Sequence, residues 1–444
     1  MKKVISKWGI VFCLIFLLSG CEGSPFESPA PVALTFWHVY GGQTDSPMNT
    51  LVERFNQSVG REKGIIINVT CLSNSTDIHF ALTSAAQKHP GAADLPDLFT
   101  TYPKTALAIG PDLLVDWKDY LSHDQRSEFV PSFMEEGEIN GRLVLLPVAK
   151  SSSALFINAT IFDQFSKDTG VRYEDLATWE GMYRAAKRYY QWSGGKAFFK
   201  YDDWLHYSMI NTAAFGGSFF KDGKINFEDD WFRGVWSKLA ASAVSGEVCL
   251  LGGYSTTAMM TGEVLCGVES TASVLYFKDT VTFPDNTTIP LRLKILPVPL
   301  FKEGKPLAIQ RGGGLGLFKS TEKKERAAAV FAEWLTAVEN NVPFVITTGY
   351  FPVKSKAYQS FLEKNDFQFL SEKYRELYEA VLKIHSDYQF YVPPFFDSYG
   401  EVEKAFSEAQ IELFKKYRRN TNDDPVALES LTHTMFTELQ SSME

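Results

Sequence analysis

Residues capable of chemistry are plentiful in this sequence, but they do not stand at the spacing of a catalytic site. The run Gly312-Gly313-Gly314 lacks the Lys-Ser/Thr ending of a phosphate-binding loop, and no Gly-x-Ser-x-Gly elbow occurs. The 53 acidic residues supply no distinctive pair of carboxylates, and the seven His residues are scattered singly without a zinc spacing. We therefore expect neither catalysis, nor a metal, nor a cofactor.

Cys21, near the start of the chain, follows a basic segment and an apolar segment. Three lysines precede an apolar run at residues 8–18, which ends in Leu18-Ser19-Gly20-Cys21. This ending resembles the bacterial lipobox, where cleavage exposes the cysteine and its thiol receives a diacylglycerol. We expect residues 1–20 to be a lipoprotein signal peptide. Cys21 is expected to carry the lipid, including palmitate, and residues 21–32 are expected to form a tether. The alternative is an ordinary signal peptide with an incidental cysteine.

The net charge bears on nucleic-acid binding, and the remaining cysteines bear on disulfide formation. Removing residues 1–20 deletes three Lys and no acid, so the formal charge of -9 becomes -12, which argues against nucleic acid. Cys71, Cys249 and Cys266 are an odd number of thiols. Either Cys249 and Cys266 form a disulfide or all three are buried thiols, and the second reading is favoured.

Three aromatic residues are candidates for the wall of a polar-ligand pocket. Trp37, Trp204 and Tyr350 lie beside turns or polar clusters, where a ring can face a ligand, although core packing explains such rings equally well.

Alternating strand and helix patterns must position these side chains. Residues 32–39 and 65–71 are rich in β-formers, and between them Ser46-Pro47 begins a helix with apolar residues at helical spacing. Thr178 caps a later helix, and Ser320 is expected to cap the helix that follows the strand at residues 312–318. This alternation predicts an α/β fold with mostly parallel sheets covered by helices.

The chain resembles the family 1 extracellular solute-binding proteins, and the similarity covers nearly everything from Leu34 onward. The matching segments occur in the family's order, at residues 34–38, 95–99, 140–147, 151–158, 178–180, 216–217, 261–266, 312–314, 333–335 and 348–352. Within the family, residues 36–38, 266–273 and 348–352 look most like the glycerol-3-phosphate and glycerophosphodiester binders.

This resemblance implies a set of ligand contacts. Ser151, Ser273, Gly313 and Tyr350 match contact positions of that branch, and Trp204 falls near an aromatic wall of its cleft. Two positions depart from the pattern. No acid stands near residues 102–103, and no arginine stands at residues 395–398. Either Lys150 or Arg311 then supplies the positive charge for a phosphate, or the ligand is neutral.

The implied architecture is periplasmic-binding-protein-like, with two α/β lobes joined by a hinge and ligand in the cleft between them. The first lobe is expected at residues 33–147 with 308–350, and the second at residues 148–307 with 351–444. The implied function is that of a monomeric, lipid-anchored component of an ABC importer, facing the periplasm or exterior. It would pass a glycerophosphodiester or related glycerol phosphate to the membrane permease. Import of a neutral sugar or oligosaccharide is the alternative, and a lipid-anchored carbohydrate-active hydrolase or a ligand sensor is an alternative of another class.

Overall fold

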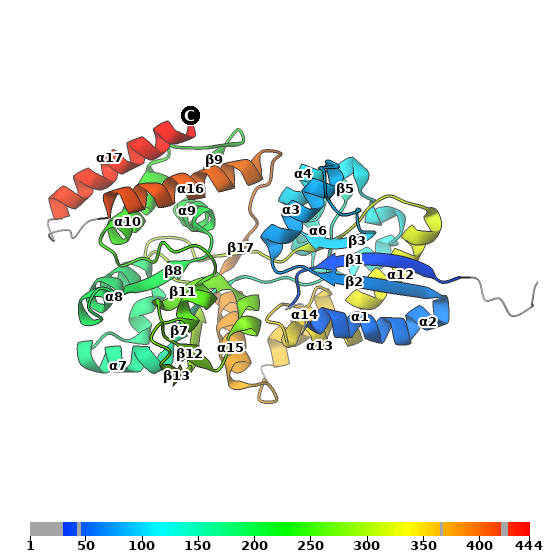
Figure 1. Cartoon of the computed structure of the whole chain (residues 1–444), viewed down its shortest axis with the longest axis horizontal. Helices are drawn as coiled ribbons and strands as arrows, with labels where there is room; N and C mark the ends of the chain where they lie inside the picture. Colours follow the sequence, from blue (N-terminus) through cyan, green and yellow to red (C-terminus); the bar gives the residue numbers. More distant parts are fainter. Residues whose placement is uncertain (1–29, 42–45, 365–366, 419–424) are drawn as a thin grey trace, which may run out of the picture.

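The structure is a computed structural model, and it describes residues 30–41, 46–364, 367–418 and 425–444. The predicted signal peptide, the lipidated Cys21 and most of the tether lie outside the described residues. Within the described part of the chain, no helix has the length and apolar character needed to cross a membrane. The chain forms two lobes side by side along the long axis of the molecule (Figure 1).

The first lobe is built on a five-stranded sheet. Its strand order is β2-β1-β3-β16-β6, with bounds β1 (Val32–His38), β2 (Ile65–Cys71), β3 (Leu98–Thr101), β6 (Leu146–Pro147) and β16 (Gly314–Leu317). β1 pairs in parallel with β2 and β3, but β16 is antiparallel to both β3 and β6. The prediction of mostly parallel sheets was therefore wrong, because β16 enters the sheet from the opposite end after the chain returns from the second lobe.

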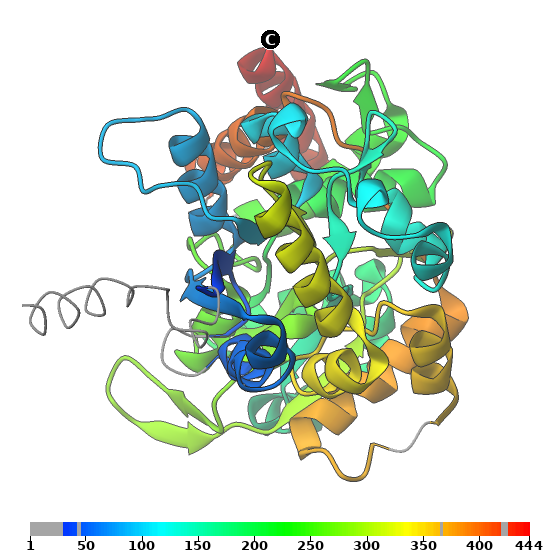
Figure 2. The ribbon, with the colours of Figure 1, turned by 90° about the vertical axis from the view of Figure 1, so that its right-hand side faces the viewer.

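Helices cover both faces of this sheet, as the alternation of side chains along β1 requires. Leu34 and Phe36 pack in a core with α1 (Pro47–Gln57), α12 (Glu322–Thr336) and α13 (Val338–Ile346). Trp37 points to the opposite face, where α3 (Ser75–Ala86) and α4 (Pro103–Ile109) pack. Figure 2 looks onto this lobe along the long axis and shows α12 lying across the sheet.

The second lobe is built on a four-stranded sheet of order β14-β7-β11-β8. Its strands are β7 (Ser153–Asn158), β8 (Ala197–Tyr201), β11 (Val264–Ser270) and β14 (Leu293–Pro297). Only β8 and β11 are parallel. One core includes residues of α7 (Ala159–Thr169), α8 (Trp179–Trp192), α9 (Trp204–Ala214), α10 (Asp230–Val244), α16 (Tyr399–Tyr417) and α17 (Pro425–Met443). The other includes residues of α11 (Ser255–Met260) and α15 (Glu372–Asp387).

Short elements complete the two lobes. They are α2 (Val59–Lys63), α5 (His123–Ser127), α6 (Pro131–Glu135), α14 (Ser355–Lys364), β4 (Glu138–Ile139), β5 (Arg142–Leu143), β9 (Phe220–Lys221), β10 (Lys224–Ile225), β12 (Thr280–Thr282), β13 (Thr288–Pro290), β15 (Leu307–Ile309) and β17 (Gln389–Tyr391), with 3₁₀ turns η1 (Pro111–Leu113), η2 (Trp117–Asp119), η3 (Tyr173–Ala177) and η4 (Thr271–Tyr276).

Helix caps followed the sequence signals closely. The Ser46 side chain caps α1 by accepting from the Asn49 amide, and Thr178 caps α8 in the same way through Gly181. The cap of α12 is Thr321 rather than the predicted Ser320, because the Thr321 hydroxyl accepts from the Lys324 amide. The amide of Ser320 instead donates to the Glu325 carboxylate at 2.7 Å.

Between the lobes, crossing segments are tied together by backbone hydrogen bonds. Ser151 and Arg311 exchange two such bonds of 2.9 and 2.8 Å, and the Phe351 amide donates to the Lys150 carbonyl at 2.6 Å. The Gln310 amide donates to the Tyr391 carbonyl at 2.8 Å, next to the parallel pair β15 and β17. These segments form the base on which the two lobes meet.

Candidate functional site

A pocket lies where the two lobes face each other above the crossing segments. Its lining comes from both lobes and from the crossing segments: Ser75, Tyr102, Lys104, Glu136, Asp203, His206, Gln310, Arg311, Pro393, Phe395, Tyr399 and Glu403. The cavity volume is about 70 Å³. Binding pockets for small organic molecules span roughly 300–1,000 Å³. The lobes must therefore part, or shift, before an organic solute can enter.

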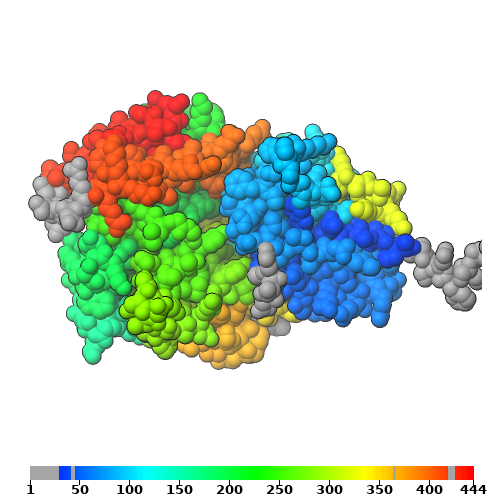
Figure 3. Space-filling model, in the orientation of Figure 1, coloured from blue at the N-terminus to red at the C-terminus, as the bar shows by residue number. Residues whose placement is uncertain are grey.

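Contacts across the cleft hold the lobes together. Lys104 of α4, in the first lobe, forms an ion pair with Glu403 of α16, in the second. The hydroxyl of Tyr276 accepts from the Gly41 amide at 3.3 Å, which joins η4 of the second lobe to the end of β1. Figure 3 shows the orange-red surface of α16 reaching the blue surface of the first lobe. The structure is thus a closed form.

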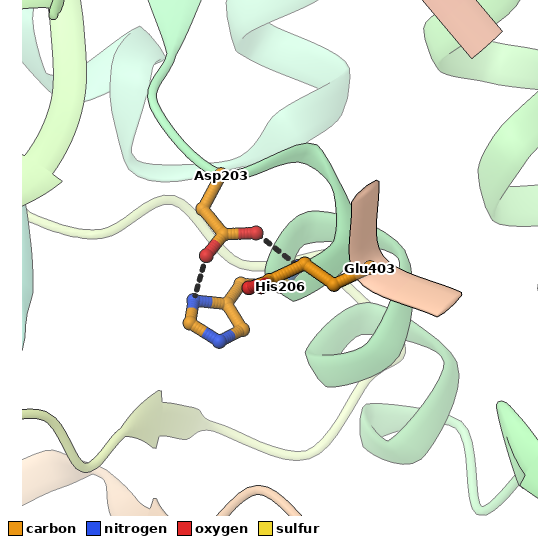
Figure 4. Close-up of side chains that lie close together, drawn as sticks. All are labelled: Asp203, His206 and Glu403. Carbon is orange, nitrogen blue, oxygen red and sulfur yellow. Dashed lines mark hydrogen bonds and ion pairs between the residues drawn. The ribbon is translucent and has the colours of Figure 1, made fainter. Parts of the chain in front are cut away.

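Local structure explains where the charged groups of the pocket stand. Asp203 caps α9, and its Oδ1 accepts from the His206 amide at 3.0 Å, which turns Oδ2 toward the imidazole. The His206 Nδ1 lies 2.8 Å from that Oδ2 (Figure 4). Burial works to raise the pKa of Asp203, but His206 and Arg311 outweigh it and hold that pKa below its ordinary value.

Arg311 is the one predicted ligand contact that lines the pocket. Its guanidinium donates to the Ser153 hydroxyl at 3.4 Å, and no described carboxylate forms an ion pair with it. Burial works to lower the pKa of Arg311, while Tyr102 and Asp203 raise it above its ordinary value. A charged guanidinium with donors to spare therefore faces the cleft.

Lys150, the other predicted cation, does not line the pocket. Its ammonium group is 3.0 Å from the Glu136 carboxylate and donates to the Gly312 carbonyl at 2.9 Å. Both side chains are almost fully buried, at 3% and 2% exposure. Gln310 also donates to Glu136. The charge of Lys150 is thus balanced within the protein.

The four positions carried over from the resemblance lie near the crossing segments. Ser151 is buried, and its hydroxyl accepts from Ser270 at 3.3 Å. A side chain at Gly313 would place its Cβ 2.8 Å from the Thr101 carbonyl, so this residue lets two backbones approach. Tyr350 packs edge-on against Tyr40 with ring centroids 5.2 Å apart.

Ser273 lies in η4, close to a buried carboxyl group in the second lobe. The hydroxyl of Thr256 donates to Glu269, whose other oxygen is buried without a hydrogen-bond partner. Burial, with the neighbouring Asp202 carboxylate, raises the pKa of Glu269 to about 8, although the Thr256 and Ser273 hydroxyls act to lower it. This carboxyl is therefore protonated over much of the physiological range.

The two predicted tryptophans are largely packed in the lobes. Trp204 is 4% exposed and packs against Tyr201 and Tyr207, at centroid distances of 5.9 and 6.5 Å. Trp37 is partly buried against the α3 and α4 face of the first lobe. Neither lines the pocket, so for both residues a ligand contact stays a prediction.

Two aromatic residues of the pocket stand where the sequence departs from the family pattern. Tyr102 lies where the family resemblance implies an acidic residue, and Phe395 lies in the segment where it implies an arginine. Both side chains line the cavity. Sequence reasoning did not single out Lys104, Asp203, His206 or Glu403. Only the N-cap position of Asp203 was readable from the sequence, because the others meet through tertiary contacts.

The three cysteines in the described part of the chain are free, buried thiols. The favoured reading from sequence was therefore correct, and Cys249 and Cys266 form no disulfide in this structure.

Comparison with known proteins places these features in context. A family model described as bacterial extracellular solute-binding protein matches residues 50–369. No curated protein matches the sequence.

Solved structures of solute-binding proteins share the fold. The ABC substrate-binding protein Lmo0181 of Listeria monocytogenes, in complex with cycloalternan, has a TM-score of 0.70 at 16% identity over 93% of this chain and 99% of that one. UgpB of Mycobacterium tuberculosis, in complex with glycerophosphocholine, has a TM-score of 0.67 at 16% identity over 94% and 98%. The cyclic alpha-maltosyl-1,6-maltose binding protein of Arthrobacter globiformis has a TM-score of 0.65 at 18% identity over 93% and 99%. The predicted two-lobed α/β fold is thus confirmed.

Proposed function

Because the chain belongs to the family of bacterial extracellular solute-binding proteins, we propose that it holds its solute in the pocket between the lobes and passes it to an ABC permease. The family binds solutes outside the cytoplasm and is not enzymatic, as the sequence led us to expect. Contacts from both lobes make the pocket complete only when the lobes close. Ligand and closure are therefore coupled, and the closed form is what a permease can recognise.

The proposed ligand is a glycerophosphodiester, and the observation that carries this choice is the guanidinium of Arg311. It lines the pocket without an ion-pair partner among the described residues, whereas Lys104 and Lys150 are both paired. A diester carries a single negative charge, which one guanidinium can meet through two hydrogen bonds. The UgpB structure, bound to glycerophosphocholine, shares the fold.

The carboxylates of the pocket favour a diester over a phosphate monoester. Asp203 and Glu403 lie in the same lining as Arg311. A monoester carries a charge of about -1.5 to -2 at neutral pH. Its second charge would meet no free cation and would lie close to these acids, so glycerol-3-phosphate is expected to bind more weakly.

A neutral oligosaccharide is the second candidate, favoured by the aromatic rings of the pocket. Tyr102, Phe395 and Tyr399 contribute to the lining, and aromatic faces stack on the apolar faces of sugars. Sugar complexes also occur among the similar structures.

Calorimetry distinguishes the two ligands. Glycerophosphocholine, glycerol-3-phosphate and maltose-type sugars are titrated into wild type and into Arg311→Gln, Lys150→Met, Trp204→Ala and Tyr102→Ala. For a diester, Arg311→Gln should lower affinity roughly ten- to hundredfold, the equivalent of a lost charge-assisted hydrogen bond of about 1.5–3 kcal/mol. Tight sugar binding that depends on Tyr102, with no response to any phosphate compound, would favour the second candidate instead.

Closure is tested by small-angle X-ray scattering on the same protein. Saturating ligand should stabilise the closed form and lower the radius of gyration relative to the ligand-free protein. One-to-one stoichiometry and a monomeric mass should accompany the change. An unchanged scattering profile at saturation would argue against coupling between binding and closure.

Attachment to the membrane is proposed through a lipid on Cys21, supported by the lipobox-like ending of residues 18–21. Two acyl chains on one residue are enough for stable anchoring. Cells grown with labelled palmitate should label the wild-type chain but not Cys21→Ala. Equal label on both proteins would refute the anchor.

A further inference from the structure

Three potential metal ligands from two helices meet on the second lobe. Asp203 and His206 stand at the start of α9, and Glu403 stands on α16. One ligand atom of each residue lies within 4.8 Å of the other two (Figure 4). The set combines one imidazole nitrogen with two carboxylate oxygens, and such donors suit zinc and related first-row ions rather than calcium or magnesium.

The imidazole contacts one carboxylate of this set. His206 Nδ1 lies 2.8 Å from Asp203 Oδ2 as an ion-pair contact, and Nδ1 is buried without another partner. The second oxygen of Asp203 is occupied at the helix cap. The cap therefore fixes the carboxylate, and an ion that binds here would replace the direct contact between Oδ2 and Nδ1.

A second, independent feature points at the same place. Tyr399 lines the pocket together with the three ligands, is 1% exposed, and its hydroxyl has no hydrogen-bond partner in the described structure. Burying a hydroxyl without a partner is costly, so an unpaired one indicates a missing partner. A metal ion, or a water bound to it, would provide that partner.

In the closed form, Lys104 from the first lobe pairs with one of the three potential metal ligands. The ammonium of Lys104 pairs with Glu403, and among the described residues Glu403 forms no other ion pair. All three ligands belong to the second lobe, whereas Lys104 belongs to the first. Opening the lobes withdraws Lys104, so that Glu403 loses its ion-pair partner and Arg311 is the remaining cation near Asp203.

We propose that Asp203, His206 and Glu403 bind a zinc-type divalent cation on the open second lobe, and that this ion competes with Lys104 and opposes lobe closure. Tetrahedral zinc with ligand bonds of about 2.1 Å holds its donors about 3.4 Å apart. The present spacing of up to 4.8 Å therefore needs side-chain shifts of about 1 Å. Tyr399 or water would complete the coordination.

Zinc titration of the purified protein tests the site without any organic ligand. Calorimetry should show one Zn²⁺ per chain in wild type, at least tenfold weaker binding in Glu403→Gln and in His206→Gln, and no binding of Mg²⁺. Glu408→Gln, an exposed position on the same helix, is the matched control and should bind as wild type does. Lys104→Met should bind Zn²⁺ severalfold more tightly, because Glu403 loses its competitor.

Scattering then tests the effect on closure. Zn²⁺ should raise the radius of gyration of wild type and leave that of Glu403→Gln unchanged. Wild-type zinc affinity in both Glu403→Gln and His206→Gln would overturn the site. Zinc binding without a rise in radius, or no tightening in Lys104→Met, would overturn the competition. Circular dichroism of each variant separates lost binding from lost folding.

Discussion

Replacing Lys150 tests whether this buried cation serves the ligand or the fold. Its ammonium lies 3.0 Å from the Glu136 carboxylate, and both side chains are nearly inaccessible to water. In Lys150→Met the aliphatic stem is kept, so little cavity opens, but Glu136 is left as a buried charge without a cation. We expect a large loss of stability and a small change in the affinity of any ligand that the protein retains.

The magnitude follows from the geometry. At 3.0 Å and an effective dielectric constant of about 20, the attraction between unit charges is about 5.5 kcal/mol. Removal of one partner of a buried pair typically costs about 3–5 kcal/mol, because the other charge remains desolvated. Lys150→Met should therefore lower the free energy of unfolding by about 3–5 kcal/mol. The double variant Lys150→Met with Glu136→Gln should recover most of this loss, since Gln310 can still donate to the new amide oxygen.

Urea unfolding followed by circular dichroism measures these differences for the two single variants and the double variant. The double-mutant cycle isolates the interaction between the two residues. A loss below about 1 kcal/mol in Lys150→Met, or a double variant no more stable than the single one, would refute the assignment of Lys150 to the fold. A hundredfold loss of ligand affinity with unchanged stability would instead indicate that Lys150 contacts the ligand.

Three further outcomes are expected. Glu269 has a pKa raised to about 8, so the folded state holds a proton that the unfolded state releases at lower pH. Stability should therefore fall between about pH 4.5 and 8, by at most about 1.4 kcal/mol per pH unit, and Glu269→Gln should flatten this slope in urea unfolding. Gly312 has a φ of +97°, and an added Cβ would lie 2.4 Å from the Ala149 carbonyl. Gly312→Ala should then lower the urea midpoint much more than Gly64→Ala, where φ is +66° and no atom lies within 4 Å. Trp204→Ala should cost about 3–5 kcal/mol of stability, because the ring is 4% exposed in the core, and a stability change below 1 kcal/mol would contradict that packing.

Elements with local signals were predictable from the sequence. The cap at Ser46 with Pro47 after it predicted α1, and segments rich in β-formers predicted β1 and β2, because capping and strand propensity act within one turn or strand. The choice between Ser320 and Thr321 as the cap of α12 was missed, since adjacent hydroxyl residues give the same signal and side-chain geometry decides between them. Strand direction was also missed, because it depends on how the chain returns from the other lobe.

The candidate site shows the same division. Arg311 was one of two cation candidates from the sequence, because it lies next to Gly313, a contact position that the family resemblance implies. The tertiary structure adds that it faces the pocket without an ion-pair partner among the described residues. Lys150 could not be distinguished from it by sequence, because its neutralising partner Glu136 meets it only in the folded chain. Lys104 and Glu403 are 299 positions apart and meet only across the cleft. Sequence by itself determined the elements and the family, since both rest on local pattern. Which charges remain free was decided by tertiary structure alone, because pairing and desolvation depend on groups distant in the chain.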